Sequence, residues 1–332
     1  MAEMCLSKQH PMLVDEVDQQ RKGDEYERRA ANEVRGWAIF CGDFENAINL
    51  LEKACSLYKP LKAFDKLAGV HMKIARCYLK MGKVEEAAST YVAAAQYFKK
   101  YPSEGAVTCL SRAAMLFEEI GQLSTSARYF QELGDIFEAE GKLSESKEHY
   151  RNAADLYLAN DSQVLSNQCR TKVAKHAAEL ERYTEAIPLF EALARDAVTA
   201  AASKKTVREM FLYAGLCHLC SVGGNGGVVK EALKRFQEVD PNFSSSRESK
   251  IIFYFATAFE KKSRNLYTEV LNTHEVLFRN DPLARLLANR GQKKLKALPA
   301  RLKTTRQDSE VQQANLDQLG EPMTDTNEEM TQ

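Results

Sequence analysis

The sequence has no excess charge of either sign and no long hydrophobic run. Lysine plus arginine and aspartate plus glutamate each number 46 in 332 residues, so the formal net charge is zero. A chain without a global positive field has no general attraction for nucleic acid, and electrostatic binding must come from local patches. The longest apolar stretch, residues 251–259, is about half the roughly 20 residues that a membrane-spanning helix needs. We therefore expect no nucleic-acid partner and no transmembrane span.

Signals for export and for disulfide bonding are also missing. Residues 1–29 are rich in charged and polar side chains and lack the apolar centre of a secretory signal. Eight cysteines are scattered through the chain and stand in helical patterns. In a chain without an export signal, such cysteines are typical of reduced thiols that fill core space. We expect a cytoplasmic protein without disulfides.

Motifs for catalysis, cofactors and metals are absent or incomplete. The chain has no nucleophile elbow, zinc-protease helix motif or P-loop, and its one glycine cluster, residues 223–227, lacks the lysine-hydroxyl pair that holds phosphates. Cys217, His218 and Cys220 resemble half of a metal site, but a structural zinc needs a second ligand pair, which is not present. We expect no catalytic residues, metal or cofactor. An enzyme that uses these three residues stays an alternative, which stoichiometric metal would support.

What the sequence does contain is a repeat. Similar phrases begin at Gly42, Gly82 and Gly141, and weaker copies begin at Gly121 and Glu181. The unit is about twenty residues and its pairs repeat at about forty, the scale of helix-pair solenoids. In each phrase a glycine can end one helix in the left-handed conformation, and the acidic or hydroxyl residues that follow favour the start of the next. One unit is therefore one helix and one turn.

Between the turns, apolar residues follow helical spacing and alanine is frequent on the apolar stripes, which lets neighbouring helices pack closely. Residues 240–244 break the chain before a helix from about residue 247. The sequence predicts an all-α protein: a tetratricopeptide-like right-handed superhelix of antiparallel helix pairs with a C-terminal helical bundle. Because the periodicity fades after about residue 195, we place the solenoid at residues 1–200 and the bundle at 201–300.

The last part of the chain has a different composition. A basic run comprises Arg290, Lys293, Lys294, Lys296, Arg301, Lys303 and Arg306, and residues 307–332 then carry seven acids and no lysine or arginine. With so few apolar side chains, residues 301–332 are expected to form a disordered acidic tail.

Several longer phrases are specific enough to indicate a family. Residues 98–107 with 109–113, residues 216–220 and residues 241–250 are similar to stretches of alpha-type soluble NSF attachment proteins, and residues 149–157 agree with them. The match runs in order from about residue 43 to about residue 282. The chain thus resembles this family over most of its length.

The resemblance implies an adaptor without chemistry of its own. Several copies would bind the outside of a SNARE four-helix bundle, formed by a syntaxin-like protein and its partner SNAREs. The copies would recruit and stimulate the NSF-type AAA+ ATPase that disassembles the bundle in vesicle fusion and membrane trafficking. Such a protein would be cytoplasmic and peripherally associated with membranes, with a transient membrane contact. The repeat alone leaves open a general tetratricopeptide-type chaperone or trafficking scaffold that binds short peptide motifs.

The family contacts SNAREs through basic residues on one face, and the resemblance carries that role to five positions. These SNARE-binding candidates are Lys99, Lys100, Arg112, Arg128 and Lys172. Two further positions that are basic in the family are Gln122 and Gln168 here, and Arg170 and Lys175 could compensate. For each candidate, a plain solvated helix residue is the alternative.

The family also has a membrane-contacting loop and an ATPase-facing end. The resemblance assigns Trp37, Ile39 and Phe40 to the loop, although Glu33-Val34 stands where the family has a phenylalanine pair. Burial against the next helix is the alternative, because residues 35–40 could equally extend the first helix up to the turn at Gly42. It assigns ATPase binding to Glu260, Glu328, Glu329 and Met330. Thr257, Lys261 and Lys262 stand where the family has acids, which predicts an altered ATPase-facing surface.

Overall fold

The chain is all-helical wherever the computed structural model describes it, which is at residues 3–35, 43–100, 105–200, 203–221 and 225–297. These ranges contain fifteen α-helices, one short 3-10 helix and no strand. The first helices are α1 (Glu3–Arg35), α2 (Phe44–Tyr58), α3 (Phe64–Lys80), α4 (Val84–Phe98) and α5 (Gly105–Glu119). The next are α6 (Leu123–Ala139), α7 (Leu143–Ala159), α8 (Gln163–Glu179), α9 (Tyr183–Thr199) and α10 (Lys204–Ser221). The last are α11 (Gly226–Val239), η1 (Pro241–Ser245), α12 (Arg247–Glu260), α13 (Arg264–Thr273), α14 (Glu275–Asn280) and α15 (Pro282–Ala297).

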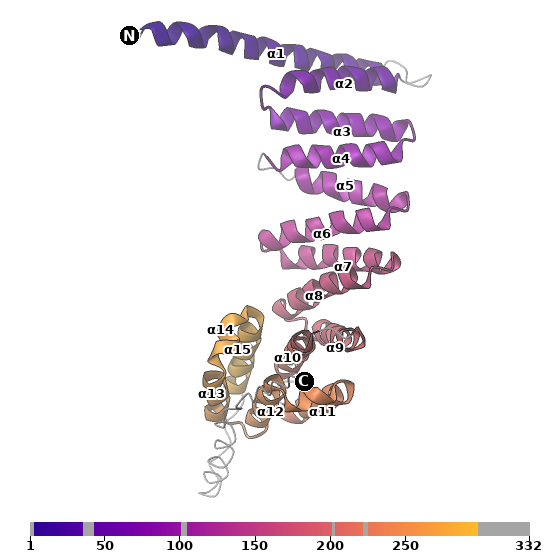
Figure 1. Ribbon diagram of the computed structural model, residues 1–332. Helices are drawn as coiled ribbons and strands as arrows, with labels where there is room; N and C mark the ends of the chain where they lie inside the picture. Colours follow the sequence, from indigo (N-terminus) through magenta and orange to yellow (C-terminus); the bar gives the residue numbers. More distant parts are fainter. Residues whose placement is uncertain (1–2, 36–42, 101–104, 201–202, 222–224, 298–332) are drawn as a thin grey trace, which may run out of the picture.

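The helices form a stack that ends in a bundle. Figure 1 shows α1 to α8 lying on one another as successive antiparallel layers, while α9 to α15 gather at the C-terminal end. The predicted all-α fold of tetratricopeptide-like helix pairs with a C-terminal bundle is confirmed. Within the described ranges no helix combines the length and apolar character that crossing a membrane requires.

One repeated turn produces the twenty-residue period. Gly82, Gly121 and Gly141 have φ angles of 73°, 77° and 73°, a left-handed conformation that glycine adopts without steric cost. After each glycine, the next amide donates to a carbonyl five residues earlier, as Lys83 does to Tyr78 at 2.9 Å. Glu181 makes the same turn with φ 61°. A helix of 17 residues plus a turn of three gives the period read from the sequence.

Small residues at a fixed position in the helices allow neighbouring helices to approach one another closely. The fourth residue of six helices is fully buried and is alanine or serine: Ala47, Ala87, Ser126, Ser146, Ser166 and Ala186. The Ser126 hydroxyl donates to the Ala114 carbonyl at 2.9 Å, and the Ser146 hydroxyl donates to the Gly134 carbonyl at 2.8 Å. Because the Ser126 and Ser146 hydroxyls bond to the backbone of the preceding helix, a polar residue is accommodated at these two contacts between helices.

The buried side chains form three successive clusters. The first lies between α1 and α3, the second runs from Ala75 to Val173, and the third runs from Ala174 to Leu295. The third cluster joins the second half of α8 and all of α9 to helices α10 to α15. The boundary predicted after residue 200 lies within this cluster and stays a prediction.

Helix α15 is attached to two other helix ends by its basic side chains. The Arg290 guanidinium donates to the carbonyls of Ala178 at 2.9 Å and Glu179 at 2.7 Å, at the C-terminus of α8. The Lys294 ammonium donates to the Cys220 carbonyl near the C-terminus of α10. The last carbonyls of a helix lack intrahelical partners and carry partial negative charge, so cations are favoured there. Part of the basic run thus fixes the bundle to the stack.

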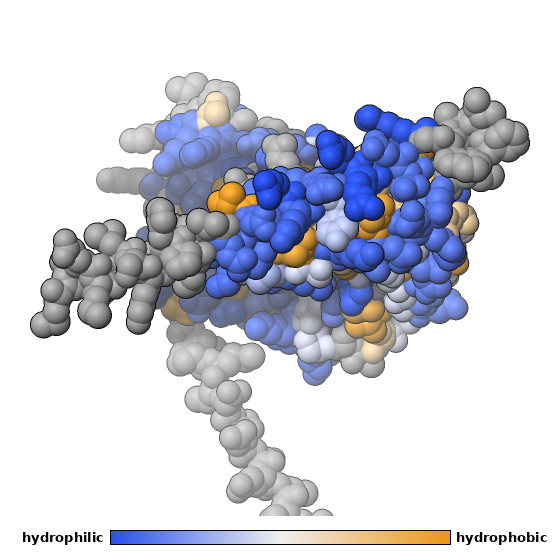
Figure 2. Space-filling view, turned by 90° about the horizontal axis from the view of Figure 1, so that it is seen from above, coloured by the Kyte–Doolittle hydropathy of each residue, from blue (hydrophilic) through white to orange (hydrophobic). Residues whose placement is uncertain are grey.

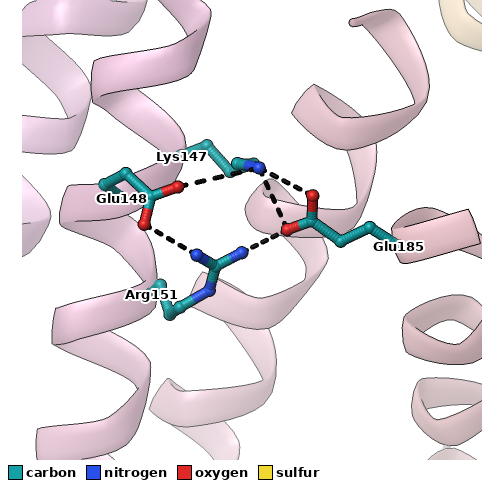
Figure 3. Close-up of polar contacts among 4 residues, drawn as sticks. All are labelled: Lys147, Glu148, Arg151 and Glu185. Atoms are coloured by element: carbon teal, nitrogen blue, oxygen red, sulfur yellow. Dashed lines mark hydrogen bonds and ion pairs between the residues drawn. The ribbon is translucent and has the colours of Figure 1, made fainter. Parts of the chain in front are cut away.

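A buried charge network joins α7 to α9. The Lys147 side chain is 1% exposed, and its ammonium contacts the Glu185 carboxylate at 2.7 Å. Arg151 also pairs with Glu185, and Glu148 lies 2.7 Å from Arg151 and 3.7 Å from Lys147, which closes the ring of four side chains in Figure 3. Burial alone would raise the pKa of Glu185, but the hydrogen bond from Lys147 and the nearby positive charges lower it.

Candidate partner-binding surface

Three of the predicted basic positions lie on, or at the end of, even-numbered helices of the stack. Lys99 at the end of α4 pairs with Glu132 on α6, and Lys172 on α8 contacts Glu138 on α6 at 2.7 Å. Ion pairs thus connect α4 to α6 and α6 to α8, and Arg128 is exposed on α6. We call Lys99, Lys100, Arg128 and Lys172 the even-helix row.

The cations of the even-helix row have partners within the chain. Lys100 lies over the rings of Phe64 and Tyr97, with its ammonium 5.1 Å and 5.9 Å from the centroids. Arg128 lies 4.8 Å over the Tyr129 ring and donates to the Tyr129 hydroxyl at 2.9 Å. Arg112 lies apart from the row, exposed on α5, and makes no ion pair with another described residue.

The ion pairs of the row can be exchanged for contacts with a partner. The Lys99 side chain is 40% exposed and the Lys172 side chain 43%. Ion pairs at this exposure contribute only about 0.2–1 kcal/mol, because water screens both charges. A carboxylate on a partner could therefore replace Glu132 or Glu138 at little cost in free energy. The sequence analysis did not identify these two acids.

Gln122 and both candidates for compensation, Arg170 and Lys175, also have partners within the chain. The Gln122 amide donates to Glu85 on α4 at 3.0 Å, and Gln168 is exposed on α8. Arg170 pairs with Asp196 at 2.8 Å, and Lys175 lies 3.5 Å from Glu209 on α10. The two candidates for compensation are thus paired as well, and Lys175 extends the line of lysine-glutamate pairs from α8 to α10.

Glu138 belongs to an arrangement that occurs twice in the chain. In this arrangement one helix carries a glycine followed by an Asp-x-x-Glu phrase. The hydroxyl of a buried tyrosine on the next helix donates to both acids. A lysine on the third helix pairs with one of the two acids. The two sets are Gly23, Asp24, Glu27, Tyr58 and Lys66, and Gly134, Asp135, Glu138, Tyr150 and Lys172. The repeated Gly-Asp-x-x-Glu phrase was a readable signal that the sequence analysis did not use.

The Tyr150 set explains the ionisation of Glu138. Burial would raise the pKa of Glu138, but hydrogen bonds from Lys172 and Tyr150 and the positive charge of Lys172 lower it. Burial, reinforced by the two carboxylates, raises the pKa of Tyr150. The carboxylate therefore stays charged beside Lys172, and the lysine is held in place over the Tyr150 ring at 5.7 Å.

The predicted ATPase-facing residues lie at the other end of the molecule or outside the described ranges. Glu260 ends α12 and pairs with Lys230 on α11 at 2.5 Å. The Lys230 ammonium lies 5.0 Å over the ring of Phe253, which is 44% exposed. Lys261 and Lys262 are exposed in the following turn. Glu328, Glu329 and Met330 lie outside the described residues.

The membrane-loop candidates Trp37, Ile39 and Phe40 also lie outside the described residues. Figure 2 views the molecule from above, from the α1 end of the stack, and the coloured surface there is mainly hydrophilic, with hydrophobic side chains in small separate patches. The membrane contact stays a prediction.

The cysteine-histidine phrase is packed into α10. Cys217 and Cys220 are fully buried, and burial raises the pKa of the Cys220 thiol to about 11. The Cys220 thiol donates to the Leu287 carbonyl at 3.3 Å, while the His218 ring lies 3.2 Å from Glu191 on α9. Within the ranges that the structure describes, no group of three or more histidine, cysteine and acidic side chains is placed to hold a metal ion.

Comparison with known proteins identifies the family. The family model described as "Soluble NSF attachment protein, SNAP" matches residues 20–296. The chain belongs to the soluble NSF attachment protein family. This attachment protein is 30% identical over 281 residues to an alpha-soluble NSF attachment protein of Vitis vinifera, with 85% of the chain and 96% of the relative covered.

Two further relatives come from distant organisms. The attachment protein is 28% identical over 261 residues to the alpha-soluble NSF attachment protein of Mus musculus, with 77% of the chain and 88% of the relative covered. It is 30% identical over 264 residues to a probable vesicular-fusion protein, a sec17 homolog, of Schizosaccharomyces pombe, with 78% and 91% covered. The resemblance read from the sequence is confirmed.

Proposed function

We propose that this chain is an adaptor that binds assembled SNARE complexes and recruits and stimulates an NSF-type AAA+ ATPase for their disassembly. The observation that carries the proposal is the family match over residues 20–296, which runs from within α1 almost to the end of α15. The proposal assigns the chain to vesicle fusion and membrane trafficking, as a binding protein without chemistry of its own.

The even-helix row supports a contact with a rod that carries acidic side chains. Its members lie on, or at the end of, three helices of the stack, so they present charge along it. A long partner can form many weak ion pairs with such a row. Each pair contributes little, and their number sets the affinity. Several copies around one SNARE bundle would add to this effect.

The row can be tested through the salt dependence of binding. We expect replacement of Lys99, Lys100, Arg128 and Lys172 by alanine to weaken binding to a soluble SNARE complex about tenfold or more at low salt. The dissociation constant of the variant should also change less with salt, because fewer charges remain to be screened. Both quantities are obtained by titration at several salt concentrations.

A matched control has the same loss of charge elsewhere. Lys234, Lys250, Lys261 and Lys293 are exposed on the C-terminal helices, and their replacement by alanine should leave SNARE affinity and its salt dependence unchanged. Equal effects of the two variants would remove the row from the proposal.

A second experiment tests the adaptor role as a whole. Purified chain, soluble SNARE complex and NSF should form a ternary complex in ATP under conditions that block hydrolysis, detected by pull-down on the SNARE complex. The alternative, a scaffold for short peptide motifs, predicts competition by isolated SNARE peptides instead of a requirement for the folded bundle. Absence of the ternary complex would reject the adaptor.

A further inference from the structure

A large cleft lies where α8, α10, α12 and the turn between α14 and α15 meet. Its volume is about 770 Å³. The floor includes the apolar side chains Leu212, Leu277 and Leu283, and the rim includes Val276, which is 59% exposed. The cleft combines this apolar surface with charged side chains of both signs.

Three of the four acids that line the cleft have partners within the chain, and the fourth, Glu179, makes no ion pair with another described residue. The Tyr213 hydroxyl donates to Glu209 and to Asp281, each at 2.9 Å, and Asp281 also accepts from the amide of Ala284 at 2.9 Å. Glu248 lies 3.3 Å from its neighbour Arg247. The charges of Glu209 and Asp281 therefore serve the packing of α10 against α15, and Glu248 pairs at the start of α12.

Two of the cations in the cleft have no such role. Lys205 and Arg208, in the first two turns of α10, make no ion pair with another described residue. Lys205 is exposed and Arg208 half-buried. On the α10 side of the cleft, Lys205 and Arg208 thus offer two positive charges without an ion-pair partner beside the apolar floor, which suits a segment with carboxylates and a few aliphatic side chains.

The chain itself contains such a segment. Residues 307–332 have seven acids and no lysine or arginine, and include the aliphatic Val311, Leu316 and Leu319. Leu283 lies at the cleft and α15 ends at Ala297, roughly 21 Å along the helix axis. Residues 298–306 can span up to about 30 Å when extended, so the acidic segment can return to the cleft.

We propose that residues 307–332 dock in this cleft as an intramolecular ligand of Lys205 and Arg208. A tethered segment has an effective concentration in the millimolar range, so even a weak contact is populated. The cleft borders the Lys175–Glu209 pair, which continues the lysine-glutamate pairs of the even-helix row. A docked tail would place negative charge beside the row and oppose the approach of an acidic partner.

Photo-crosslinking in the full-length chain tests the contact without any partner protein. A photo-reactive amino acid replaces Leu316, and its crosslinks are mapped by mass spectrometry. We expect intramolecular crosslinks to residues of α10 and the α14–α15 turn, with a yield that falls at least about fivefold between about 50 mM and 500 mM salt. Crosslinks confined to residues 290–306, or formed only between molecules, would overturn the proposal.

Charge variants on both sides of the contact give a sharper test. Lys205→Glu with Arg208→Glu should lower the yield of cleft crosslinks at least about fivefold, and so should Glu310→Gln with Asp317→Asn and Glu321→Gln in the tail. Lys234→Glu with Lys261→Glu makes the same change of net charge on exposed sites outside the cleft and should leave the yield unchanged. Equal yields in all three variants would also overturn the proposal. Because no SNARE or ATPase is present, this result is independent of the proposed function.

Discussion

Lys147 and Glu185 differ in how much each depends on the other. Lys147 is 1% exposed, whereas Glu185 is 28% exposed and has a second cation, Arg151, as partner. Removing the lysine leaves a carboxylate that is still hydrated by water and paired with Arg151. Removing the glutamate leaves a buried ammonium with only Glu148, 3.7 Å away. An uncompensated buried charge is the more costly outcome.

We therefore predict losses of stability of unequal size at the two ends of one ion pair. Lys147→Met keeps the buried volume and should cost less than about 1 kcal/mol, while Glu185→Ala should cost about 3 kcal/mol. Urea unfolding followed by far-UV circular dichroism measures both. Equal losses would mean that the pair, rather than the buried lysine, sets the stability of the contact between α7 and α9.

At the scale of the element, glycine in a helix has two different effects in this chain. A Cβ atom at Gly23 in α1 would lie 2.6 Å from Cε1 of Tyr58, whose ring is fully buried and whose hydroxyl bonds to Asp24 and Glu27. A Cβ atom at Gly69 in α3 would meet nothing within 4 Å. Only the first glycine is required by packing.

The two glycines predict stability changes of opposite sign. Gly23→Ala should destabilise the protein by about 1–3 kcal/mol, because the anchored tyrosine ring cannot move aside. Gly69→Ala should stabilise it by about 0.5–1 kcal/mol, the usual preference of a helix for alanine. The urea midpoints of both variants, compared with wild type, decide this. A stabilising Gly23→Ala would show that α1 can shift away from α2.

The helices could be predicted from the sequence where nearby residues determine where each helix begins and ends. The turn glycines at 82, 121 and 141 carry the period, and the break at residues 240–244 appears as η1 followed by α12 at Arg247. The partners of Lys99 and Lys172 were not predictable, because they lie 33 and 34 residues away on alternate helices. Which side chains meet there depends on the register of the packed helices, and a single sequence does not specify that register.

For the whole molecule, histidines couple stability to pH. Burial lowers the pKa of His71, His149, His176 and His274 below the ordinary value of 6.5. Each has a ring nitrogen that is buried without a hydrogen-bond partner. In the unfolded chain these rings regain a pKa of about 6.5 and bind protons first as the pH falls. Their contribution to the free energy of unfolding is fully present when the pH is well above about 6.5 and is lost as the pH falls below that value.

We predict a urea midpoint that is flat from about pH 7 to 8 and falls between about pH 6.5 and 5. His149 provides the test, because its ring stacks on Phe137 with centroids 5.1 Å apart and on Phe130 at 6.1 Å. His149→Phe keeps the stack and removes the titrating group, so the fall should become smaller. A variant with the wild-type pH profile would exclude His149 as a contributor. The acids with lowered pKa, such as Glu138 and Glu185, act at lower pH and are separable from this effect.

The attachment of α15 to the ends of α8 and α10 has a mechanical consequence. Arg290 reaches back across more than a hundred residues of chain to the last carbonyls of α8, and Lys294 reaches the end of α10. A force applied to the last helix is therefore delivered to the middle of the chain directly, without passing through α11 to α14 in series. A load on α15 would therefore act on the ends of α8 and α10 at the same time.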